Sequence, residues 1–434
     1  MILTRIKIGW YLVTIIAAVP VILWARMYPL SIRFMATGQT LTSIGQMLSL
    51  TGITLFAISL ILSARLPVYE NLFGGMNKVY VAHHLIGGIA FLLLMAHPLF
   101  LAGNRMLLSM RAAFMFLIPI PVNWPVYFGI IALLSMMVLL IITYYLKLPY
   151  RYWKLTHKLL GIAFLFGALH AFYIPSDISL NQPLRIYVLS LCAIGLAMYT
   201  YRALLGRLLI RKHNYTVRAV YRVSPEVLEL EMVPDGKSMD FTAGQFVFMA
   251  VKGKLFYGDY HPFSISSGPS QNELRLTVKS LGPFTRGLVS VAPGSKVAIE
   301  GPYGRFSYAA LKNKYQIWVA GGIGITPFLS MARTFYGLDH RIDLVYAVHD
   351  LSEAVYSQEL LMISRANPMF RVFLFDSVRY GHLDAAKLSQ MCQGLAGKEI
   401  FLCGPPPMMA SLRKQLRKSG VGDGNIHSEE FQIL

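Results

Sequence analysis

The chain has 434 residues, of which 55% are hydrophobic and only 14% are charged, and its formal net charge is +19 at pH 7. Soluble proteins carry about 25% charged residues, so this composition excludes a wholly soluble protein and places much of the chain in lipid. The basicity belongs to the hydrophobic half, because residues 1–213 hold 17 of the 40 Lys and Arg residues but only two acids, Glu70 and Asp177. That bias is typical of membrane topology, and we expect no nucleic acid partner because no basic cluster stands out in the soluble half.

Six apolar runs are long enough to cross a bilayer, which takes about 20 residues per helix. They lie near residues 8–28, 44–64, 80–102, 124–146, 155–173 and 184–206. The first run lacks a small-residue cleavage site and is interpreted as a retained helix. Twelve Lys and Arg residues flank one set of helix ends and five flank the other, which places the N-terminus and everything after residue 207 in the cytoplasm. The sequence thus predicts a multi-pass integral membrane protein, surrounded by membrane lipid, in the inner or plasma membrane of a bacterium.

Two of these spans carry histidines in matched positions: His83 and His97 in the third span, and His157 and His170 in the fifth. In both spans a glycine follows the first histidine by four residues, where it would let a flat group approach the helix backbone. The histidines of each span are 14 and 13 residues apart, which is roughly 20 Å along a helix. Fourteen residues keep His83 and His97 on one helix face. Thirteen do not, so the fifth span must contain a bend or bulge.

Ionisable side chains at membrane depth are costly and usually mark a functional site. Two levels of paired histidines, one from each helix, are what two stacked b-type haems with two histidine ligands each require. We therefore predict that His83 and His157 bind the inner iron and that His97 and His170 bind the outer iron. Packing explains Phe164, near the middle of the fifth span, better than a position between the haems. No Asp or Glu lies within a span, which disfavours a proton- or cation-coupled transporter.

The rest of the chain shows two successive patterns. From about residue 214, short β-rich runs separated by turns predict a small antiparallel barrel. From about residue 314, strands alternate with helices, which predicts a parallel sheet covered by helices. The predicted fold is therefore a multidomain membrane protein with a six-helix transmembrane bundle, an antiparallel β-barrel domain and an α/β parallel-sheet domain. The predicted boundaries are 1–213, 214–312 and 313–434.

The segment "YQIWVAGGIGITPFLS" reads as a strand, a glycine turn and the start of a helix. Gly321, Gly322 and Gly324 would let the backbone approach a pyrophosphate, while Thr326 and the helix N-terminus offer hydrogen bonds and a positive dipole end. Pro327 suits a first helical turn. In this context the turn predicts a nucleotide-binding site.

Three further motifs complete a recognisable set: "GDYHPFSISSGP", "VKSLGPFTRGL" and "CGPPPMM". With them the soluble half resembles the ferredoxin–NADP reductase family, and the whole chain resembles the membrane NADPH oxidase and ferric reductase superfamily. The resemblance implies FAD, two b haems and NAD(P)H as cofactors. It also implies that the four helix histidines are the haem ligands.

The resemblance further implies which soluble residues bind these cofactors. The isoalloxazine would contact His261, Pro262, Phe263 and Ser264, with the Ser264 hydroxyl near N5. The ribityl and phosphate groups would lie along Ser266, Lys279, Gly282, Phe284 and Thr285. The pyrophosphate of NAD(P)H would bind at Gly321, Gly322, Gly324, Ile325, Thr326 and Pro327. The nicotinamide would lie near Cys403, Gly404 and Pro405, which makes Ser264 and Cys403 the candidate catalytic residues.

Two positions depart from the pattern of that superfamily. Members selective for NADPH often have an arginine after the second strand of the nucleotide domain, where this chain has His349 and Asp350. The aspartate could accept a hydrogen bond from a ribose hydroxyl and so favour NADH, while Arg379 could bind the 2′-phosphate instead. Many members also end on an aromatic residue that stacks on the flavin. Here Phe431 is followed by three more residues.

The sequence therefore predicts electron transfer from cytoplasmic NAD(P)H through FAD and two haems to an acceptor outside. A flavin can take two electrons and release them singly, which joins a hydride donor to one-electron haem iron. The leading hypothesis is an NAD(P)H oxidase that forms superoxide from O2, because loop 103–125 has no carboxylates for a metal ion. The alternatives are a ferric or cupric reductase, which would take a ferric chelate, and an electron-donor subunit for a periplasmic protein, although no obligatory protein partner is evident.

Overall fold

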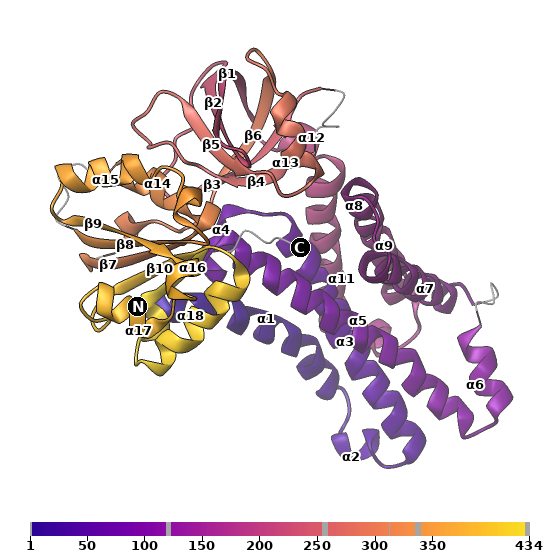
Figure 1. Ribbon diagram of the computed structural model, residues 1–434. Helices are drawn as coiled ribbons and strands as arrows, with labels where there is room; N and C mark the ends of the chain where they lie inside the picture. The colour runs from indigo at the N-terminus through magenta and orange to yellow at the C-terminus, as the bar shows by residue number, and fades with distance from the viewer. Residues whose placement is uncertain (1, 119–122, 254–258, 312, 335–339, 430–434) are drawn as a thin grey trace. The chain divides into compact units, whose positions relative to one another are not determined.

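The computed structural model describes residues 2–118, 123–253, 259–311, 313–334 and 340–429. These residues form two compact units (Figure 1). The first unit comprises Thr4–Gly74 and Lys78–Ile210 and is helical, and the second consists mainly of Arg211–Leu434 and contains two sheets.

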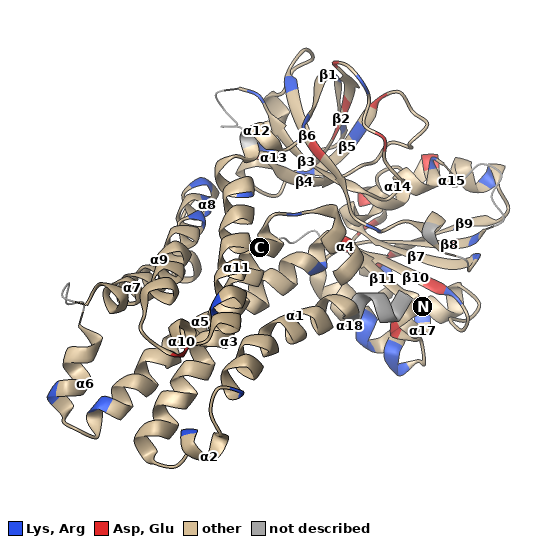
Figure 2. Ribbon diagram, turned by 180° about the vertical axis from the view of Figure 1, so that it is seen from behind, with Lys and Arg blue, Asp and Glu red and all other residues tan. Residues whose placement is uncertain are grey.

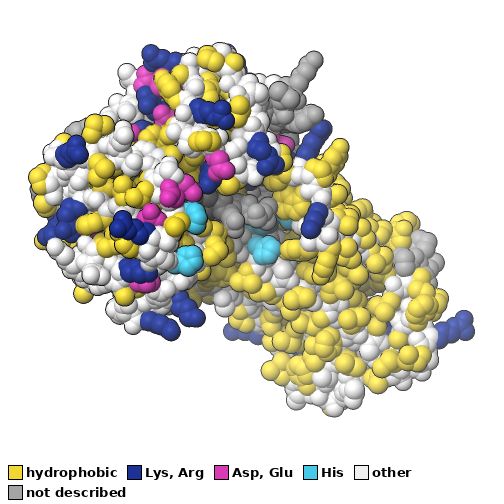
Figure 3. All heavy atoms as spheres, viewed as in Figure 1, with side chains coloured by type: hydrophobic (Ala, Val, Ile, Leu, Met, Phe, Trp, Pro, Cys, Tyr) yellow, Lys and Arg dark blue, Asp and Glu magenta, His cyan; other side chains and the backbone are white. Residues whose placement is uncertain are grey.

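The helical unit carries six helices that are long and apolar enough to cross a membrane. They are α1 (Ile2–Ala25), α3 (Thr37–Ser63), α5 (Met76–Met106), α7 (Trp124–Tyr145), α8 and α9 together (Tyr150–Lys158 and Leu160–Tyr173), and α11 (Gln182–Tyr199) with its π-helical continuation Thr200–Leu204. The shorter helices are α2 (Leu30–Arg33), α4 (Pro67–Phe73), α6 (Met110–Leu117), α10 (Asp177–Leu180) and α12 (Gly206–Leu209). Charged residues are sparse on these helices (Figure 2), and apolar side chains cover most of their visible surface (Figure 3). The six predicted spans are confirmed.

Close packing of α3 with α9 and α11 forms the centre of the bundle. Gly195 makes the approach of α11 to α3 possible, because a Cβ atom there would lie 3.3 Å from the Cα of Ala57. Phe164 of α9 is buried and meets Phe56 of α3 edge to face, with ring centroids 4.9 Å apart. Phe164 therefore packs between helices, which is the role that the sequence favours for it.

The first sheet of the second unit is antiparallel, with strand order β4-β3-β6-β1-β2-β5. Its strands are β1 (His213–Ser224), β2 (Val227–Pro234), β3 (Phe246–Val251), β4 (His261–Ser264), β5 (Leu274–Lys279) and β6 (Lys296–Tyr303), and α13 (Pro283–Gly287) follows β5. A bridge between Ile265 and Leu276 connects the two edge strands, so the sheet closes partly on itself. The prediction of an antiparallel barrel is confirmed in the form of a half-barrel.

The second sheet is parallel and has the strand order β11-β10-β7-β8-β9. Its strands are β7 (Tyr315–Gly321), β8 (Arg341–Val348), β9 (Phe370–Asp376), β10 (Glu399–Cys403) and β11 (Ile426–Glu429). The helices between them are α14 (Thr326–Ala332), α15 (Ser357–Ala366), α16 (Ser377–Tyr380), α17 (Ala385–Met391) and α18 (Pro406–Lys418). The order reverses between β7 and β10, and ligands of parallel sheets bind at such a switch point, outside the carboxyl ends of the strands.

Candidate functional site

Backbone carbonyl groups from other segments accept hydrogen bonds from three of the four predicted haem ligands. The Nδ1 atom of His83 lies 2.9 Å from the carbonyl oxygen of Ser59, that of His97 lies 2.8 Å from Gly45, and that of His170 lies 2.6 Å from Pro125. A carbonyl oxygen can only accept, so each of these rings must carry its proton on Nδ1. The Nε2 atom then keeps its lone pair, which is the form in which a histidine binds a metal ion.

His83 and His157 lie at the distance that one shared iron requires. Their ring centroids are 6.1 Å apart and their planes differ by 75°. Metal–imidazole bonds of about 2 Å on opposite sides of one ion would separate two ring centroids by about 6 Å. These two residues, which come from α5 and α8, therefore fit the predicted inner haem iron.

The regular helix is interrupted between His157 and His170. The helix α8 ends at Lys158 and α9 begins at Leu160, and the amide of Leu159 donates to the carbonyl groups of both Leu155 and Thr156. This interruption lies within the segment where the 13-residue spacing predicts a bend or bulge.

Each of the two matched glycines, Gly87 and Gly161, lies close to a side chain of another helix. A Cβ atom on Gly161 would lie 2.3 Å from the ring of Tyr199, so the flat group against this glycine is a side chain of α11. A Cβ atom on Gly87 would lie 3.2 Å from the hydroxyl of Ser59. These close approaches come from helix packing, which the spacing along a single helix does not reveal. The neighbouring histidine, His84, is exposed and meets Tyr144 edge to face.

The predicted flavin-contacting residues converge around β4 and α13. The ring of His261 stacks on that of Phe284 with centroids 3.9 Å apart, and Phe263 stacks on Phe284 at 6.1 Å. Pro262 lies between them on β4, paired with Phe248 of β3. Ser264 is buried at the end of the same strand.

The residues predicted along the ribityl and phosphate groups are already engaged with the protein. The Thr285 hydroxyl accepts hydrogen bonds from the amides of Leu281 and Gly282, both at 2.9 Å, and so fixes the turn before α13. Lys279 forms an ion pair with Glu226 at 3.2 Å. The Ser266 side chain is fully buried, and its hydroxyl accepts a hydrogen bond from Thr277 at 3.0 Å.

The glycine turn and the "CGPPP" segment meet at the switch point between β7 and β10. A Cβ atom on Gly324 would lie 2.3 Å from the carbonyl oxygen of Cys403, so only glycine permits this approach. Gly322 has a positive φ of 51° and open space around it. Ile325 is buried, the Thr326 hydroxyl donates to the carbonyl of Ile323, and α14 starts with Thr326 and Pro327. The structure thus brings together the two segments predicted to bind NAD(P)H, including Gly321, Gly404 and Pro405.

A buried carboxyl group that the sequence did not single out lies beside Cys403. Glu429 of β11 is paired in register with Cys403 of β10, and only 5% of its surface is exposed. Burial, with a smaller contribution from the Glu429 charge, raises the pKa of the Cys403 thiol well above its ordinary value, so the thiol stays protonated at neutral pH. The sequence signal that could have identified Glu429 was an acidic residue at the end of the short strand β11. Phe431, two positions later, lies outside the described residues.

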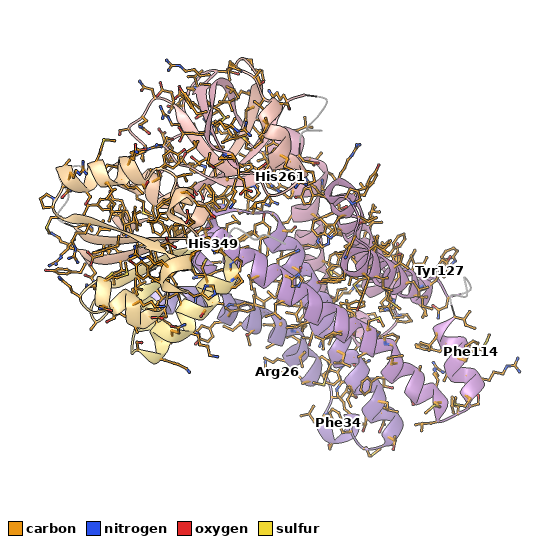
Figure 4. The ribbon with its side chains drawn as sticks, viewed as in Figure 1. Arg26, Phe34, Phe114, Tyr127, His261 and His349 are labelled. Carbon is orange, nitrogen blue, oxygen red and sulfur yellow. The ribbon has the colours of Figure 1, made fainter. Side chains whose placement is uncertain are left out.

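His349 and Asp350 follow β8 at the carboxyl edge of the parallel sheet (His349 is labelled in Figure 4). The Asp350 carboxylate accepts hydrogen bonds from the hydroxyl and amide of Ser352, which hold its pKa below the ordinary value. The His349 carbonyl accepts from the amide of Val378 at 3.0 Å. Arg379 follows Val378 directly, so it lies one residue from this backbone contact with the loop that contains His349 and Asp350.

A buried polar network joins the half-barrel to the parallel sheet. Arg333, after α14, donates to both carboxylate oxygens of Glu359 at 2.7 and 2.9 Å and to the carbonyl of Ser266 at 2.7 Å. The Tyr356 hydroxyl donates to Glu229 of β2 at 2.7 Å. Sequence reasoning missed these residues because their partners are up to 127 positions away.

Comparison with known proteins gives three family matches in the same order as the domains. Residues 48–168 match the ferric reductase like transmembrane component, residues 212–307 match an FAD-binding domain, and residues 318–414 match an oxidoreductase NAD-binding domain. The chain is 29% identical over 210 residues to the glycine betaine monooxygenase reductase subunit of Chromohalobacter salexigens, covering 44% of this chain and 56% of that protein. It is 27% identical over 224 residues to a flavohemoprotein of Rhizobium meliloti, covering 46% and 55%. The chain thus spans little more than half the length of these relatives.

A crystal structure of flavohemoglobin from Malassezia yamatoensis, with bound FAD and heme, has a TM-score of 0.51 and 18% identity, covering 90% of this chain and 96% of that one. At this identity the likeness concerns the fold alone. The six apolar helices, the half-barrel and the parallel sheet define a multi-pass membrane protein with soluble FAD-binding and NAD-binding domains. The chain belongs to the NADPH oxidase and ferric reductase superfamily.

Proposed function

We propose that this protein transfers electrons from cytoplasmic NAD(P)H across the membrane to O2 on the outer side, where superoxide forms. FAD would convert the hydride into single electrons, and two b haems would carry those electrons across the lipid. We also propose three domains, 1–213, 214–312 and 313–434. The division of the chain into compact units near Arg211 supports the first boundary.

The observation that carries this proposal is the state of the helix histidines. His83, His97 and His170 each donate from Nδ1 to a carbonyl group, and the ring centroids of His83 and His157 lie 6.1 Å apart. Among the described residues, no hydrogen bond occupies the Nε2 atoms of these four histidines. Ionisable side chains at membrane depth are costly and usually mark a functional site. Three imidazoles oriented in this way, with His157 beside His83, support two bis-histidine haems.

Within the soluble half, the chain's own residues would bind and orient the two redox partners. His261, Phe263 and Phe284 form an aromatic wall for the isoalloxazine, and Gly322 and Gly324 leave the backbone open to a pyrophosphate. The protonated Cys403 thiol would pack against the nicotinamide without adding charge. These roles rest on family resemblance and on the convergence of the segments.

Dioxygen is the acceptor we favour. His97 and His170 would hold the outer haem, which would supply one electron at a time to an acceptor on the outer side. The outer segment 103–125 also offers no carboxylate to hold a metal ion. The match to a ferric reductase like component supports a second candidate, a ferric chelate.

The test is reduction of cytochrome c by the purified protein in air, with and without superoxide dismutase, beside reduction of a ferric chelate under nitrogen. Suppression by the dismutase is expected. Rapid chelate reduction together with dismutase-insensitive cytochrome c reduction would identify a ferric reductase instead.

A further inference from the structure

His157 differs from the other three helix histidines in what supports its ring. Its Nδ1 atom is buried and makes no hydrogen bond within the described part of the chain. Instead, the imidazole stacks on the indole of Trp153, with centroids 5.3 Å apart and planes 9° from parallel. An aromatic face thus replaces the carbonyl group that holds the others.

The stack continues by one more ring. Tyr150 lies against Trp153 with centroids 5.8 Å apart and planes 19° from parallel. Residues three and four positions apart share one face of a helix, so α8 carries Tyr150, Trp153 and His157 as a continuous ladder. Its last ring is the one that faces His83.

This ladder begins at the cytoplasmic end of the helical unit. Tyr150 starts α8 and is 42% exposed, while Trp153 is half-buried. The Lys158 ammonium donates to the carbonyl of Ala203 at 3.3 Å, in the π-helix from which the chain continues to the FAD-binding half. Basic residues surround this end, as expected on the cytoplasmic side. They are Lys147, Arg151, Lys154 and Lys158.

The outer histidine pair has no comparable feature. Within the described ranges, neither His97 nor His170 has an aromatic ring stacked on it, and both are held by carbonyl groups. An aromatic ladder that reaches only the cytoplasmic pair is suited to electrons arriving from the soluble half, because π systems in contact shorten the gaps through which an electron must tunnel.

We propose that Tyr150 and Trp153 are the entry route by which electrons from the flavin reach the inner haem. This inference rests on the proposed function. One electron passes at a time from the reduced flavin to ferric inner-haem iron, which becomes ferrous. No bond of Trp153 or Tyr150 forms or breaks.

The competing explanation is that these rings only anchor α8 at the membrane surface, where Trp and Tyr are enriched. Trp124 is the matched control, because it starts α7, is 58% exposed and meets Tyr127 at 5.6 Å, and among the described residues its ring stacks on no histidine. Loss of an interfacial anchor alone would affect Trp124→Leu and Trp153→Leu alike.

The experiment uses the full-length protein loaded with FAD and haem, mixed with NADH under nitrogen in a stopped-flow spectrometer. Trp153→Leu is expected to slow inner-haem reduction by roughly tenfold, equivalent to about 1.4 kcal/mol in the barrier. Flavin reduction by NADH should stay unchanged. Trp153→Phe should restore most of the rate, and Trp124→Leu should match the wild type.

Haem content and low-temperature EPR spectra separate this role from ligand positioning. The 75° between the His83 and His157 planes should give the strongly anisotropic low-spin signal of perpendicular imidazoles. A retained rate in Trp153→Leu with both haems bound would overturn the entry route, even if the EPR signal changed.

If the Trp153→Leu variant loses haem, Tyr150→Leu is the deciding variant, because it leaves the Trp153–His157 contact intact. Slower inner-haem reduction is expected in Tyr150→Leu, and a wild-type rate would overturn the proposal. Absence of haem from the wild type would instead contradict the proposed function.

Discussion

Backbone carbonyl groups from other parts of the chain set the tautomer of three of the four helix histidines, His83, His97 and His170. His170 shows this most clearly, because its Nδ1 lies 2.6 Å from the carbonyl oxygen of Pro125 and its ring lies against Gly129. Carbonyl partners of this kind orient a ligand ring and raise its basicity. Three of the four predicted iron ligands are thus oriented by the protein itself.

Replacement of His170 by alanine should remove the outer haem and leave the inner one, since His83 and His157 come from the other end of the same two membrane spans. The pyridine haemochrome assay should show half of the wild-type haem per chain. The matched control is His84→Ala, because His84 is exposed and should leave both haems in place. Full haem content in His170→Ala would refute the assignment.

Asp350 bears on the choice of coenzyme. Hydrogen bonds from Ser352 keep its pKa low, so the carboxylate is charged at neutral pH and would repel a 2′-phosphate in its vicinity. Directly after β8, where an arginine fork could make a strong charge-assisted contact to that phosphate, the chain has His349 and Asp350. We expect NADH to be used at least as well as NADPH, and Asp350→Asn to shift the ratio of kcat/KM values towards NADPH.

Steady-state kinetics with both coenzymes provide the check. A preference for NADPH of about a hundredfold, or nearly 3 kcal/mol, would contradict this expectation. Loss of that preference in Arg379→Ala would then show that Arg379 binds the phosphate.

At the scale of elements, the network of Arg333, Glu359, Tyr356 and Glu229 connects the half-barrel to the parallel sheet. Arg333 is 8% exposed and Glu229 is 5% exposed, so removing one member leaves charge in a poorly solvated place. Arg333→Met is expected to destabilise the soluble half by on the order of 3 kcal/mol, the cost of breaking a buried ion pair. Flavin fluorescence on heating the full-length protein should show earlier FAD release.

Arg417→Met is the appropriate control for that measurement. Arg417 pairs with Asp423, and both side chains are 54% exposed, so the expected loss is within about 1 kcal/mol. Equal effects of the two substitutions would mean that the buried network contributes no more than a surface pair.

At the scale of the whole molecule, the proposal requires electrons to cross the membrane through both histidine pairs in order. His97→Ala should still allow NAD(P)H to reduce the flavin and the inner haem. Transfer to the outer acceptor should stop, because the outer iron would lose a ligand that Gly45 holds in place. Stopped-flow spectra under nitrogen should resolve the flavin and haem bands, and superoxide formation at the wild-type rate by this variant would exclude a two-haem relay.

Much of this arrangement could be predicted from local patterns. Hydropathy and length identify spanning helices because a bilayer has a fixed thickness. The 14- and 13-residue spacings indicated paired histidines and a bend or bulge in the fifth span, and the regular helix is interrupted there at Leu159. The glycine turn from Gly321 to Gly324, which follows a strand, indicated a nucleotide-binding turn, because the close approach of the backbone to a pyrophosphate needs glycine.

Contacts between distant segments could not be obtained in this way. Ser59, Gly45 and Pro125 are 24, 52 and 45 residues from the histidines whose rings they hold, and nothing in their own sequence neighbourhood marks them. Tyr199 fills the space beside Gly161 only because α11 packs there. The sequence alone determined the spans, the order of the domains and the candidate ligands, since these depend on composition and period along the chain. The tertiary structure decided which ring nitrogen is free and which aromatic ring reaches His157, because hydrogen bonds and stacking depend on how the helices pack.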